Sequence, residues 1–372
     1  MHKTIWFKIH WFLGITAGII LLIVGLTGAM LSFEKEIMNA INKDSYTVLV
    51  QDGQEKLTTK ELLEKFQYQL PEVKINSISF SSDKTTSTVI NVAGKGEGKE
   101  SRKGINYYVN PYDATILPEL KGKEFFSFVL TLHRWLAFSG DAREVGKQAV
   151  AISTIALIVL MISGIAVYWA TIKRAFFKSF TFSFKHKKRA FLSTMHSAIG
   201  MWVIPFYLVV SLTGIIMSYD VVRDTLYNMA GVQKPQKMQG TKPQGKEENR
   251  VLKFDEYEKA VNLFDTFTEK NYSTATLRFP QNGTVYSFNY TDTRHHYNSL
   301  ELDTSSLKLL KHEKYEDKTF AEQLVKSILP LHTGEYFGFI GKVGMFISSA
   351  LMALFTITGF MLYFNRINKK RK

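Results

Sequence analysis

Four of the nine histidines lie at the borders of long apolar stretches, and they are the residues most able to do chemistry. His10 and His196 each stand at the start of an apolar stretch, and His133 and His332 each precede another. A neutral imidazole nitrogen is an ordinary axial ligand for haem iron, and helical bundles build such sites from facing helices. The sequence therefore predicts haem iron bound between helices by these four side chains.

An internal repeat groups the first two of these histidines. His10 is followed four residues later by Gly14, and His196 is followed in the same way by Gly200. Both stretches then contain Leu-Thr-Gly, at 26–28 and 212–214, and the offset between the copies is 186 residues without a gap. Equivalent positions in two copies of one unit are expected at one membrane depth, so we predict that His10 and His196 form a pair.

The other two histidines follow the repeat more loosely. His133 precedes Gly164 by 31 residues, whereas His332 precedes Gly359 by 27. Four residues are about one helical turn, so we expect each histidine to keep its helix face while the depth shifts by a turn. His133 and His332 are then the second pair, because histidines separated by about 30 Å of hydrocarbon cannot share one iron atom.

Small residues near the histidines leave room for a flat macrocycle. Gly14 and Gly200 lie one turn after their histidines on the same helix face and carry no Cβ. Gly18 extends this small face, and Gly334 and Gly338 lie near the second pair. The alternative is that these glycines serve close helix packing, for which membrane helices are enriched in glycine. A single histidine near a membrane surface is likewise often only a polar residue at headgroup level.

Basic side chains beside the histidines are candidates for binding haem propionates. Arg134 directly follows His133, and Lys8, Lys188 and Arg189 lie near the first pair. Guanidinium groups favour carboxylates through paired hydrogen bonds.

Four apolar stretches are long enough to position these residues in a bilayer, whose core needs about 20 residues of helix. They cover 11–33, 148–170, 193–219 and 343–364, and none contains Lys, Arg, Asp or Glu. We predict four continuous spanning helices. The first is expected to be retained rather than cleaved as a signal peptide, because it is longer than a signal's apolar region and lacks a small-residue cleavage site.

The formal net charge of +14 is concentrated in three short segments. Residues 1–10, 171–190 and 365–372 together carry fourteen basic and no acidic residues, and the remaining 33 basic residues match 33 acidic ones. Basic flanks on one side of a four-span chain follow the positive-inside rule. We therefore expect both termini and 171–190 in the cytoplasm, in contact with lipid rather than nucleic acid.

The chain contains no cysteine. This excludes disulfides, iron–sulfur clusters and covalent c-type haem attachment. Any haem is therefore expected to be of the b type.

The two long polar segments predict similar α+β modules outside the membrane. The first has a helix at 58–70 and strands near 74–81, 86–93 and 104–110, and the second has a helix at 254–264 and strands near 272–279, 284–291 and 295–302. Segment 231–249 is typical of a linker. The expected order along the chain is: span 1–33, module 34–130, histidine segment and span 131–170, basic loop 171–190, span 191–219, module 220–330, histidine segment and span 331–364, and tail 365–372.

The other histidines are expected to be solvated. His295 and His296 lie on a predicted strand, where a weak external metal contact is the alternative. His2, His186 and His312 lie in polar surroundings.

Several of these residues also carry a resemblance to a known family. The opening 10–14 (His-Trp-Phe-Leu-Gly), the block 132–135 (Leu-His-Arg-Trp), and 196–214 with its Trp202, Pro205 and closing Leu-Thr-Gly resemble the PepSY-associated transmembrane family. The resemblance covers nearly the whole chain, and both modules look like PepSY domains. It implies a four-helix membrane protein built from two repeats of span, PepSY module and span.

The resemblance also implies a function. Characterised members act as di-haem reductases of ferric siderophores in the periplasm, so it implies two b-type haems per chain ligated by His10, His196, His133 and His332. This chain departs from the pattern at 333–334, where Thr-Gly replaces the Arg-Trp that follows His133. His332 is therefore not followed by a counterpart of Arg134, the candidate propionate partner.

Two classes of function remain open. In the first, electrons cross the membrane to a ferric siderophore or similar acceptor, and the donor is a quinol or another reductase because no dinucleotide-binding fingerprint is present. In the second, a non-enzymatic PepSY protein binds or inhibits an external partner such as a peptidase. A transporter is disfavoured because the spans contain no carboxylate.

Overall fold

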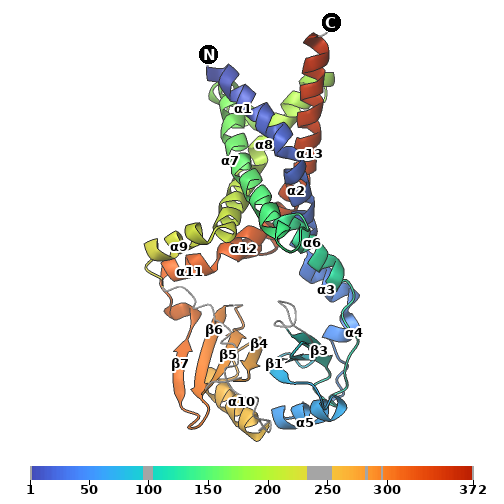
Figure 1. Ribbon diagram of the computed structural model, residues 1–372, viewed down its shortest axis with the longest axis vertical. Coiled ribbons are helices and arrows are strands. Elements are labelled where there is room, and N and C mark those ends of the chain that lie inside the picture. Colours follow the sequence, from blue (N-terminus) through green and yellow to red (C-terminus); the bar gives the residue numbers. More distant parts are fainter. Residues whose placement is uncertain (1, 95–103, 233–253, 281–283, 295, 371–372) are drawn as a thin grey trace. The chain divides into compact units, whose positions relative to one another are not determined.

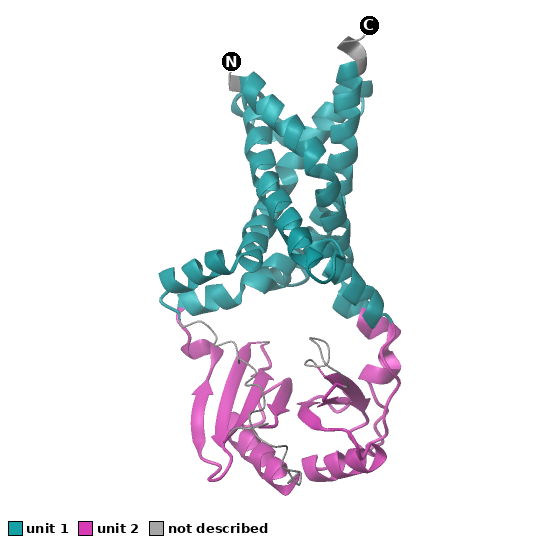
Figure 2. Ribbon diagram, in the orientation of Figure 1, with its two compact units in different colours: residues 1–37, 122–234, 320–372 teal, residues 38–121, 235–319 magenta. Residues whose placement is uncertain are grey.

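The computed structural model of the chain describes residues 2–94, 104–232, 254–280, 284–294 and 296–370. They form two compact units, each assembled from separate stretches of sequence (Figure 2). The first unit comprises 1–37, 122–234 and 320–372, and the second comprises 38–121 and 235–319. The predicted linker 231–249 lies almost wholly outside the described residues, as does His295.

Three helices of the first unit are long and apolar enough to cross a membrane (Figure 1). They are α7 (Ala142–Arg174), α8 (Lys188–Ser218) and α13 (Gly338–Lys370), and they contain the last three predicted spans. Apolar runs of this length form helices because a helix bonds every backbone amide within its own segment, as hydrocarbon requires.

The first predicted span is broken. Helices α1 (His2–Thr16) and α2 (Gly18–Ser32) meet at Ala17 with a bend of 62°. The hydroxyl of Thr16 donates to the carbonyl of Phe12 at 2.9 Å, and side-chain bonds of this kind beside a glycine are common causes of helix bends. The prediction of one continuous helix at 11–33 was therefore wrong. The chain has three candidate spans, or four when this bent pair is counted as one.

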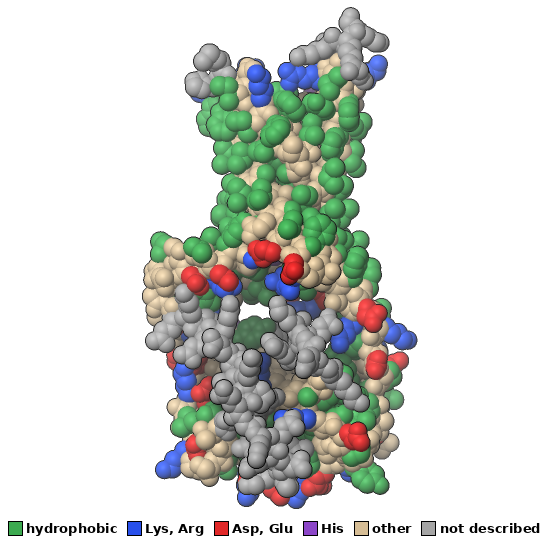
Figure 3. Space-filling model, viewed as in Figure 1, with side chains coloured by type: hydrophobic (Ala, Val, Ile, Leu, Met, Phe, Trp, Pro, Cys, Tyr) green, Lys and Arg blue, Asp and Glu red, His purple; other side chains and the backbone are tan. Residues whose placement is uncertain are grey.

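The surface of the first unit matches a membrane environment. Apolar side chains form a broad band over the long helices, and Lys and Arg side chains gather where α1 begins and α13 ends (Figure 3). These two helix ends lie at the same end of the unit (Figure 1).

His133 and His332 lie on short helices that precede the spans rather than on the spans themselves. His133 is on α6 (Lys123–Trp135), and His332 is on α12 (Ile328–Thr333). Each short helix ends against the span that follows it, with the carbonyl of Trp135 on Gly146 and the carbonyl of Gly334 on Gly341.

These two contacts locate the four-residue difference between the repeats. Gly146 and Gly341 each precede by 18 residues the glycine that closes the span. The extra residues therefore lie in the connection between α6 and α7. The expected shift of one helical turn in depth was wrong, because the insertion is in a loop and not in a helix.

The remaining helices of the chain are short. They are α3 (Glu34–Ile41), α4 (Lys43–Tyr46), α5 (Thr59–Gln69), α9 (Asp220–Met229), α10 (Phe254–Thr268) and α11 (Phe320–Lys326), with 3-10 turns η2 (Phe177–Phe180), η3 (Tyr315–Asp317) and η4 (Glu335–Phe337).

The second unit is built on one antiparallel sheet with the strand order β3-β2-β1-β4-β5-β6-β7. Its strands are β1 (Ile75–Ser81), β2 (Thr88–Val92), β3 (Ile105–Val109), β4 (Thr274–Arg278), β5 (Val285–Thr291), β6 (Tyr297–Asp303) and β7 (Leu309–Glu313). Six of them fall within the predicted strands to within two residues, and β7 was not predicted.

The two predicted modules share this sheet. Strand β1 of the first pairs with β4 of the second, with Ile78 opposite Leu277, and the hydroxyls of Ser79 and Thr276 are 2.8 Å apart across the junction. The modules therefore do not stand apart.

The core of the second unit lies between the sheet and two helices. Helix α5 begins with a capping box, in which Thr58 and Glu61 bond each other's backbone amides. It buries Phe66 on the sheet, and α10 buries Phe264, whose ring stacks on that of Phe288 at 4.5 Å.

Candidate functional site

The first histidine pair joins α1 to α8. The ring centroids of His10 and His196 are 6.2 Å apart, and the ring planes are inclined by 79°. Both side chains are partly buried among the long helices. The structure thus brings together the two histidines that share the ungapped repeat.

The second pair joins α6 to α12 and has nearly the same geometry. The ring centroids of His133 and His332 are 6.3 Å apart, and the planes are inclined by 72°. We call His10 with His196 the first pair and His133 with His332 the second pair.

In the first pair, each imidazole is fixed through its Nδ1 atom. Nδ1 of His10 is 3.0 Å from the hydroxyl of Ser163 and 3.1 Å from the carbonyl oxygen of Leu160, both on α7. Nδ1 of His196 is 2.7 Å from the hydroxyl of Thr358 on α13.

The second pair is fixed in the same way. Nδ1 of His133 is 3.0 Å from the hydroxyl of Thr27 and 3.0 Å from the carbonyl oxygen of Val24, both on α2. Nδ1 of His332 is 2.9 Å from the hydroxyl of Thr213 on α8. Among the described residues, none of the four Nε2 atoms has a hydrogen-bond partner.

The four hydroxyls share one sequence feature, since each immediately precedes a glycine. A Cβ built on Gly28 would lie 3.2 Å from Cε1 of His133, and one on Gly164 would lie 3.3 Å from Cε1 of His10. Gly28 and Gly164 thus let these two rings lie directly against the neighbouring helix, whereas a Cβ on Gly359 would meet no atom within 4 Å. These Ser/Thr-Gly dipeptides belong to the repeat, but their hydroxyls were not predicted as hydrogen-bond partners of the histidines. Their recurrence in all four apolar stretches was the available signal.

A cavity opens beside the first pair. It is lined by both histidines and by the predicted glycines 14, 18 and 200, together with aromatic side chains that include Trp11, Tyr168, Phe355 and Tyr363. The ring of Trp11 stacks on that of Tyr363 at 5.1 Å.

Two arginines also line this cavity. Arg189 was a predicted propionate partner, whereas Arg366, whose guanidinium lies 4.5 Å from the ring centre of Phe7, was not. The other two predicted partners, Lys8 and Lys188, are not among the residues that line it.

Two further arginines, Arg134 and Arg143, lie beside His133. The guanidinium carbons of Arg134 and Arg143 lie 4.7 and 3.8 Å from the ring centre of Trp135. Partial burial, followed by the charge of Arg143, lowers the pKa of Arg134, but a guanidinium stays charged at neutral pH. Neither arginine has a carboxylate within ion-pair distance among the described residues.

Gly334 and Gly338 have a conformational role. Their φ angles of 81° and 64° allow the chain to turn between α12 and α13. Gly334 packs on Gly341, so backbone packing accounts for that glycine, whereas a Cβ on Gly338 would meet no atom within 4 Å and its role as clearance for a cofactor stays a prediction.

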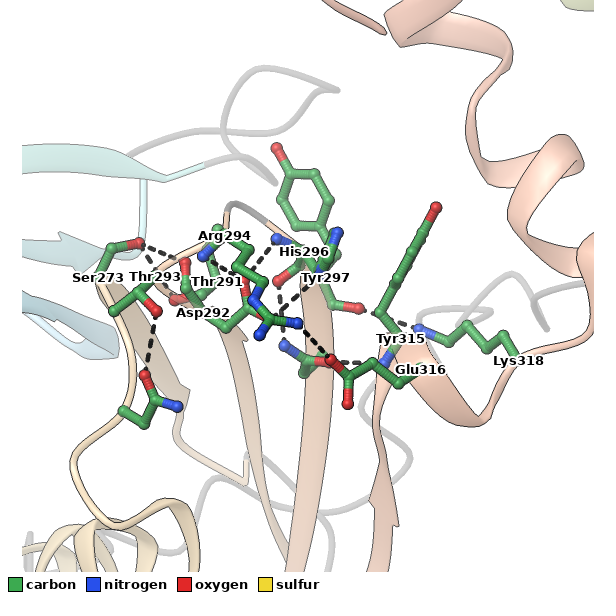
Figure 4. Close-up of polar contacts among 12 residues, drawn as sticks. Ser273, Thr291, Asp292, Thr293, Arg294, His296, Tyr297, Tyr315, Glu316 and Lys318 are labelled. Atoms are coloured by element: carbon green, nitrogen blue, oxygen red, sulfur yellow. Dashed lines mark hydrogen bonds and ion pairs between the residues drawn. The ribbon is translucent and has the colours of Figure 1, made fainter.

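His296 belongs to a polar cluster in the connection between β5 and β6 (Figure 4). Its ring stacks on Tyr315 at 4.3 Å, and its Nδ1 lies 3.2 Å from a carboxylate oxygen of Asp292. Arg294 pairs with Glu316 at 3.0 Å in the same cluster. These contacts hold the turn together.

Within the described residues, no group of three or more His, Asp or Glu side chains could hold a metal ion. The histidine pairs therefore offer two protein ligands each.

The family model described as the PepSY-associated TM region matches residues 7–366. The chain belongs to the PepSY-associated TM family. The family match spans all four paired histidines and both units. No individual curated protein matches this PepSY-associated TM chain.

Proposed function

We propose that this PepSY-associated TM protein binds two b-type haems, one at each histidine pair, and transfers electrons across a membrane. The acceptor is a ferric siderophore or a similar iron chelate outside the cell membrane. The protein would then act as a haem-dependent ferric reductase in iron acquisition.

The geometry of the two pairs is the observation that carries this proposal. An imidazole nitrogen binds a metal ion at about 2.0–2.1 Å, so two rings facing one metal atom have centroids roughly 6–6.5 Å apart. The observed separations are 6.2 and 6.3 Å. Each pair would hold one haem iron through its two imidazoles, and the porphyrin would supply the other ligands.

The glycines near the first pair support a flat ligand over simple helix packing. A Cβ on Gly14 would meet no protein atom closer than 3.9 Å, and one on Gly200 none closer than 3.7 Å. By contrast, a Cβ on Gly25 would lie 2.5 Å from Cβ of Met352, so helix packing does require glycine there. A methyl group at position 14 or 200 would make only ordinary contacts, so helix packing does not require glycine there, and a role beside a bound ligand is supported.

Each pair also has two arginines to offer to the two propionates of a haem. Arg189 and Arg366 line the cavity beside the first pair, and Arg134 and Arg143 lie beside the second. Guanidinium–carboxylate bonds are among the stronger charge-assisted hydrogen bonds.

The chemistry balances with a two-electron donor. Bound haem supplies a one-electron Fe(III)/Fe(II) couple near each membrane face. A quinol oxidised to quinone releases two electrons and two protons, and each electron reduces one chelated Fe(III) to Fe(II). A cytoplasmic or membrane reductase is the other class of donor. Reduction weakens the chelation and frees the iron.

The placement of charge supports the direction of transfer. The basic segments at the two chain ends and at 171–190 would lie in the cytoplasm by the positive-inside rule. The first pair would then face the cytoplasmic side of the inner membrane, and the second pair and the sheet unit would face the periplasm.

An optical spectrum of the purified protein, expressed with haem supplied, tests the proposal. We expect a sharp Soret band, split α and β bands on reduction, and about two haems per chain by extraction. A haem-free protein would contradict the proposal and favour a non-enzymatic PepSY protein.

Alanine variants assign the sites. His10→Ala and His196→Ala should each remove one haem and leave the other, and His133→Ala and His332→Ala should remove the second. His186→Ala, on an exposed side chain, is the matched control and should keep both. Unchanged haem content in His196→Ala would require a different ligand at the first site.

A further inference from the structure

We infer that the hydroxyls of Thr27, Ser163, Thr213 and Thr358 are positioning residues. They hold each histidine with its proton on Nδ1 and its lone pair on Nε2, and His196 depends on its hydroxyl more than His10 and His133 do. The inference rests on the proposed function for the identity of the metal that Nε2 then binds.

A hydroxyl group has one hydrogen, and each of the three threonines donates it to a backbone carbonyl of its own helix. Thr27 donates to the carbonyl of Ile23 at 2.7 Å. Thr213 and Thr358 donate to the carbonyls four residues before them, each at 2.6 Å. Only the oxygen lone pairs then face the histidines. Each threonine must therefore accept a hydrogen bond, and the imidazole must donate it.

Backbone carbonyls lead independently to the same proton position. The carbonyl oxygen of Leu160 lies 3.1 Å from Nδ1 of His10, and that of Val24 lies 3.0 Å from Nδ1 of His133. A carbonyl oxygen can only accept, so Nδ1 carries the hydrogen in both rings.

A histidine with its proton on Nδ1 presents a lone pair at Nε2, which is the atom a metal needs. A hydrogen bond from the other ring nitrogen also fixes the ring's orientation and raises the basicity of the ligand. A more basic imidazole favours ferric over ferrous iron, so the hydroxyls should lower the reduction potential of the bound haem.

His196 differs from His10 and His133. Those two histidines each have a carbonyl acceptor beside the hydroxyl. Among the described residues, the only hydrogen-bond partner of His196 Nδ1 is Thr358, at the shortest of the four distances. Removing this one hydroxyl leaves the Nδ1 proton without an acceptor.

Near-isosteric variants of the full-length protein test the inference. Thr358→Val should weaken haem binding at the first site by about 10- to 100-fold, the usual cost of losing such a partner. It should also raise that haem's potential; a tenfold change in the ferric-to-ferrous preference corresponds to about 59 mV. Thr27→Val and Ser163→Ala should give smaller shifts, because a carbonyl acceptor remains for His133 and His10.

Two further variants separate positioning from folding. Thr358→Ser keeps the hydroxyl and should restore the wild-type potential. Thr154→Val removes a hydroxyl that bonds only its own helix, through the carbonyl of Val150, and should leave both potentials unchanged.

The outcomes separate the two proposals. If the wild-type protein binds no haem, the proposed function fails. If it binds two haems but Thr358→Val leaves affinity and potential unchanged, the positioning role is overturned. An effect of Thr27→Val or Ser163→Ala as large as that of Thr358→Val would overturn the stronger dependence of His196.

Discussion

At the scale of single residues, we predict that His312 on β7 makes the stability of the sheet unit depend on pH. It was expected in solvent, but it is partly buried, and its Nε2 lies 2.7 Å from the hydroxyl of Tyr290. Burial raises the pKa of Tyr290 to about 12, so the phenol stays protonated and donates to the neutral imidazole. Burial also lowers the pKa of His312 below its usual 6.5.

A lowered histidine pKa means that the unfolded chain takes up the proton more readily. The contribution of His312 is therefore fully present above pH 6.5 and is lost as the pH falls through and below that value. We expect the amides of β5 to β7 to lose protection from hydrogen exchange between pH 7.5 and 5.5, after correction for intrinsic exchange.

The variant His312→Gln keeps an acceptor for Tyr290 but cannot titrate, so it should abolish this pH dependence. His186→Asn replaces an exposed histidine and should not alter it. Equal acid sensitivity in wild type and His312→Gln would assign the effect to other groups.

The four histidines could be predicted from residue type and spacing, but their hydrogen-bond partners could not. The pairing of His10 with His196 followed from an ungapped repeat, which places equivalent residues at equivalent depth. That Thr358 faces His196 depends on how α13 turns toward α8, and no local pattern specifies that rotation. Arg143 was missed for the same reason, since a loop brings it onto Trp135.

At the scale of elements, close contact between α6 and α7 positions the second pair. A Cβ at Gly146 would clash with the carbonyl of Trp135, and the equivalent clash at Gly341 would involve Gly334. Backbone cannot yield as a flexible side chain can, so a methyl group there must push the short helix away from the span.

We therefore predict that Gly146→Ala and Gly341→Ala each destabilise the protein by about 1–3 kcal/mol, as overpacking does. Both should also weaken haem binding at the second pair and spare the first. Thermal unfolding and the haem content of each site measure this.

Val145→Ala is the matched stability control, because this side chain next to Gly146 on α7 is 63% exposed. Its unfolding temperature should not fall. A Gly146→Ala protein as stable as wild type would show that the contact is not restrictive.

Hydropathy located the apolar stretches but could not predict whether each one forms a single unbroken helix. The break at Ala17 depends on a hydroxyl–carbonyl bond and a glycine, neither of which changes mean hydropathy. Strand β7 was missed because Leu-Leu-Lys-His-Glu at 309–313 lacks the alternation of a half-buried strand. It is an edge strand that pairs only with β6.

At the scale of the whole molecule, the sequence did not predict that the two modules share one sheet. Each polar segment contains a helix and at least three strands and reads as a complete module. Only the pairing of β1 with β4 shows that they are halves of one sheet, and a long-range pairing leaves no signature in either local sequence.

The absence of cysteine makes the proposed topology directly testable. Single substitutions Lys185→Cys and Ser305→Cys introduce one exposed thiol into the basic loop and one into the sheet unit. A membrane-impermeant maleimide added to intact spheroplasts should label only Ser305→Cys, and lysis should expose Lys185→Cys. The cysteine-free parent should not react. Labelling of Lys185→Cys in intact spheroplasts would reverse the orientation.

The pairing of β1 with β4 also sets a waiting time during synthesis. Ile78 meets Leu277, which the ribosome adds about 200 residues later. At about 5–20 residues per second, one edge of β1 stays open for roughly 10–40 seconds. Both α7 and α8 are made in that interval, and an open strand edge is a template for pairing with another chain. Newly made copies that emerge side by side are therefore the molecules most exposed to exchanging strands, and crowding of ribosomes on one message should lower the yield of correctly closed sheets.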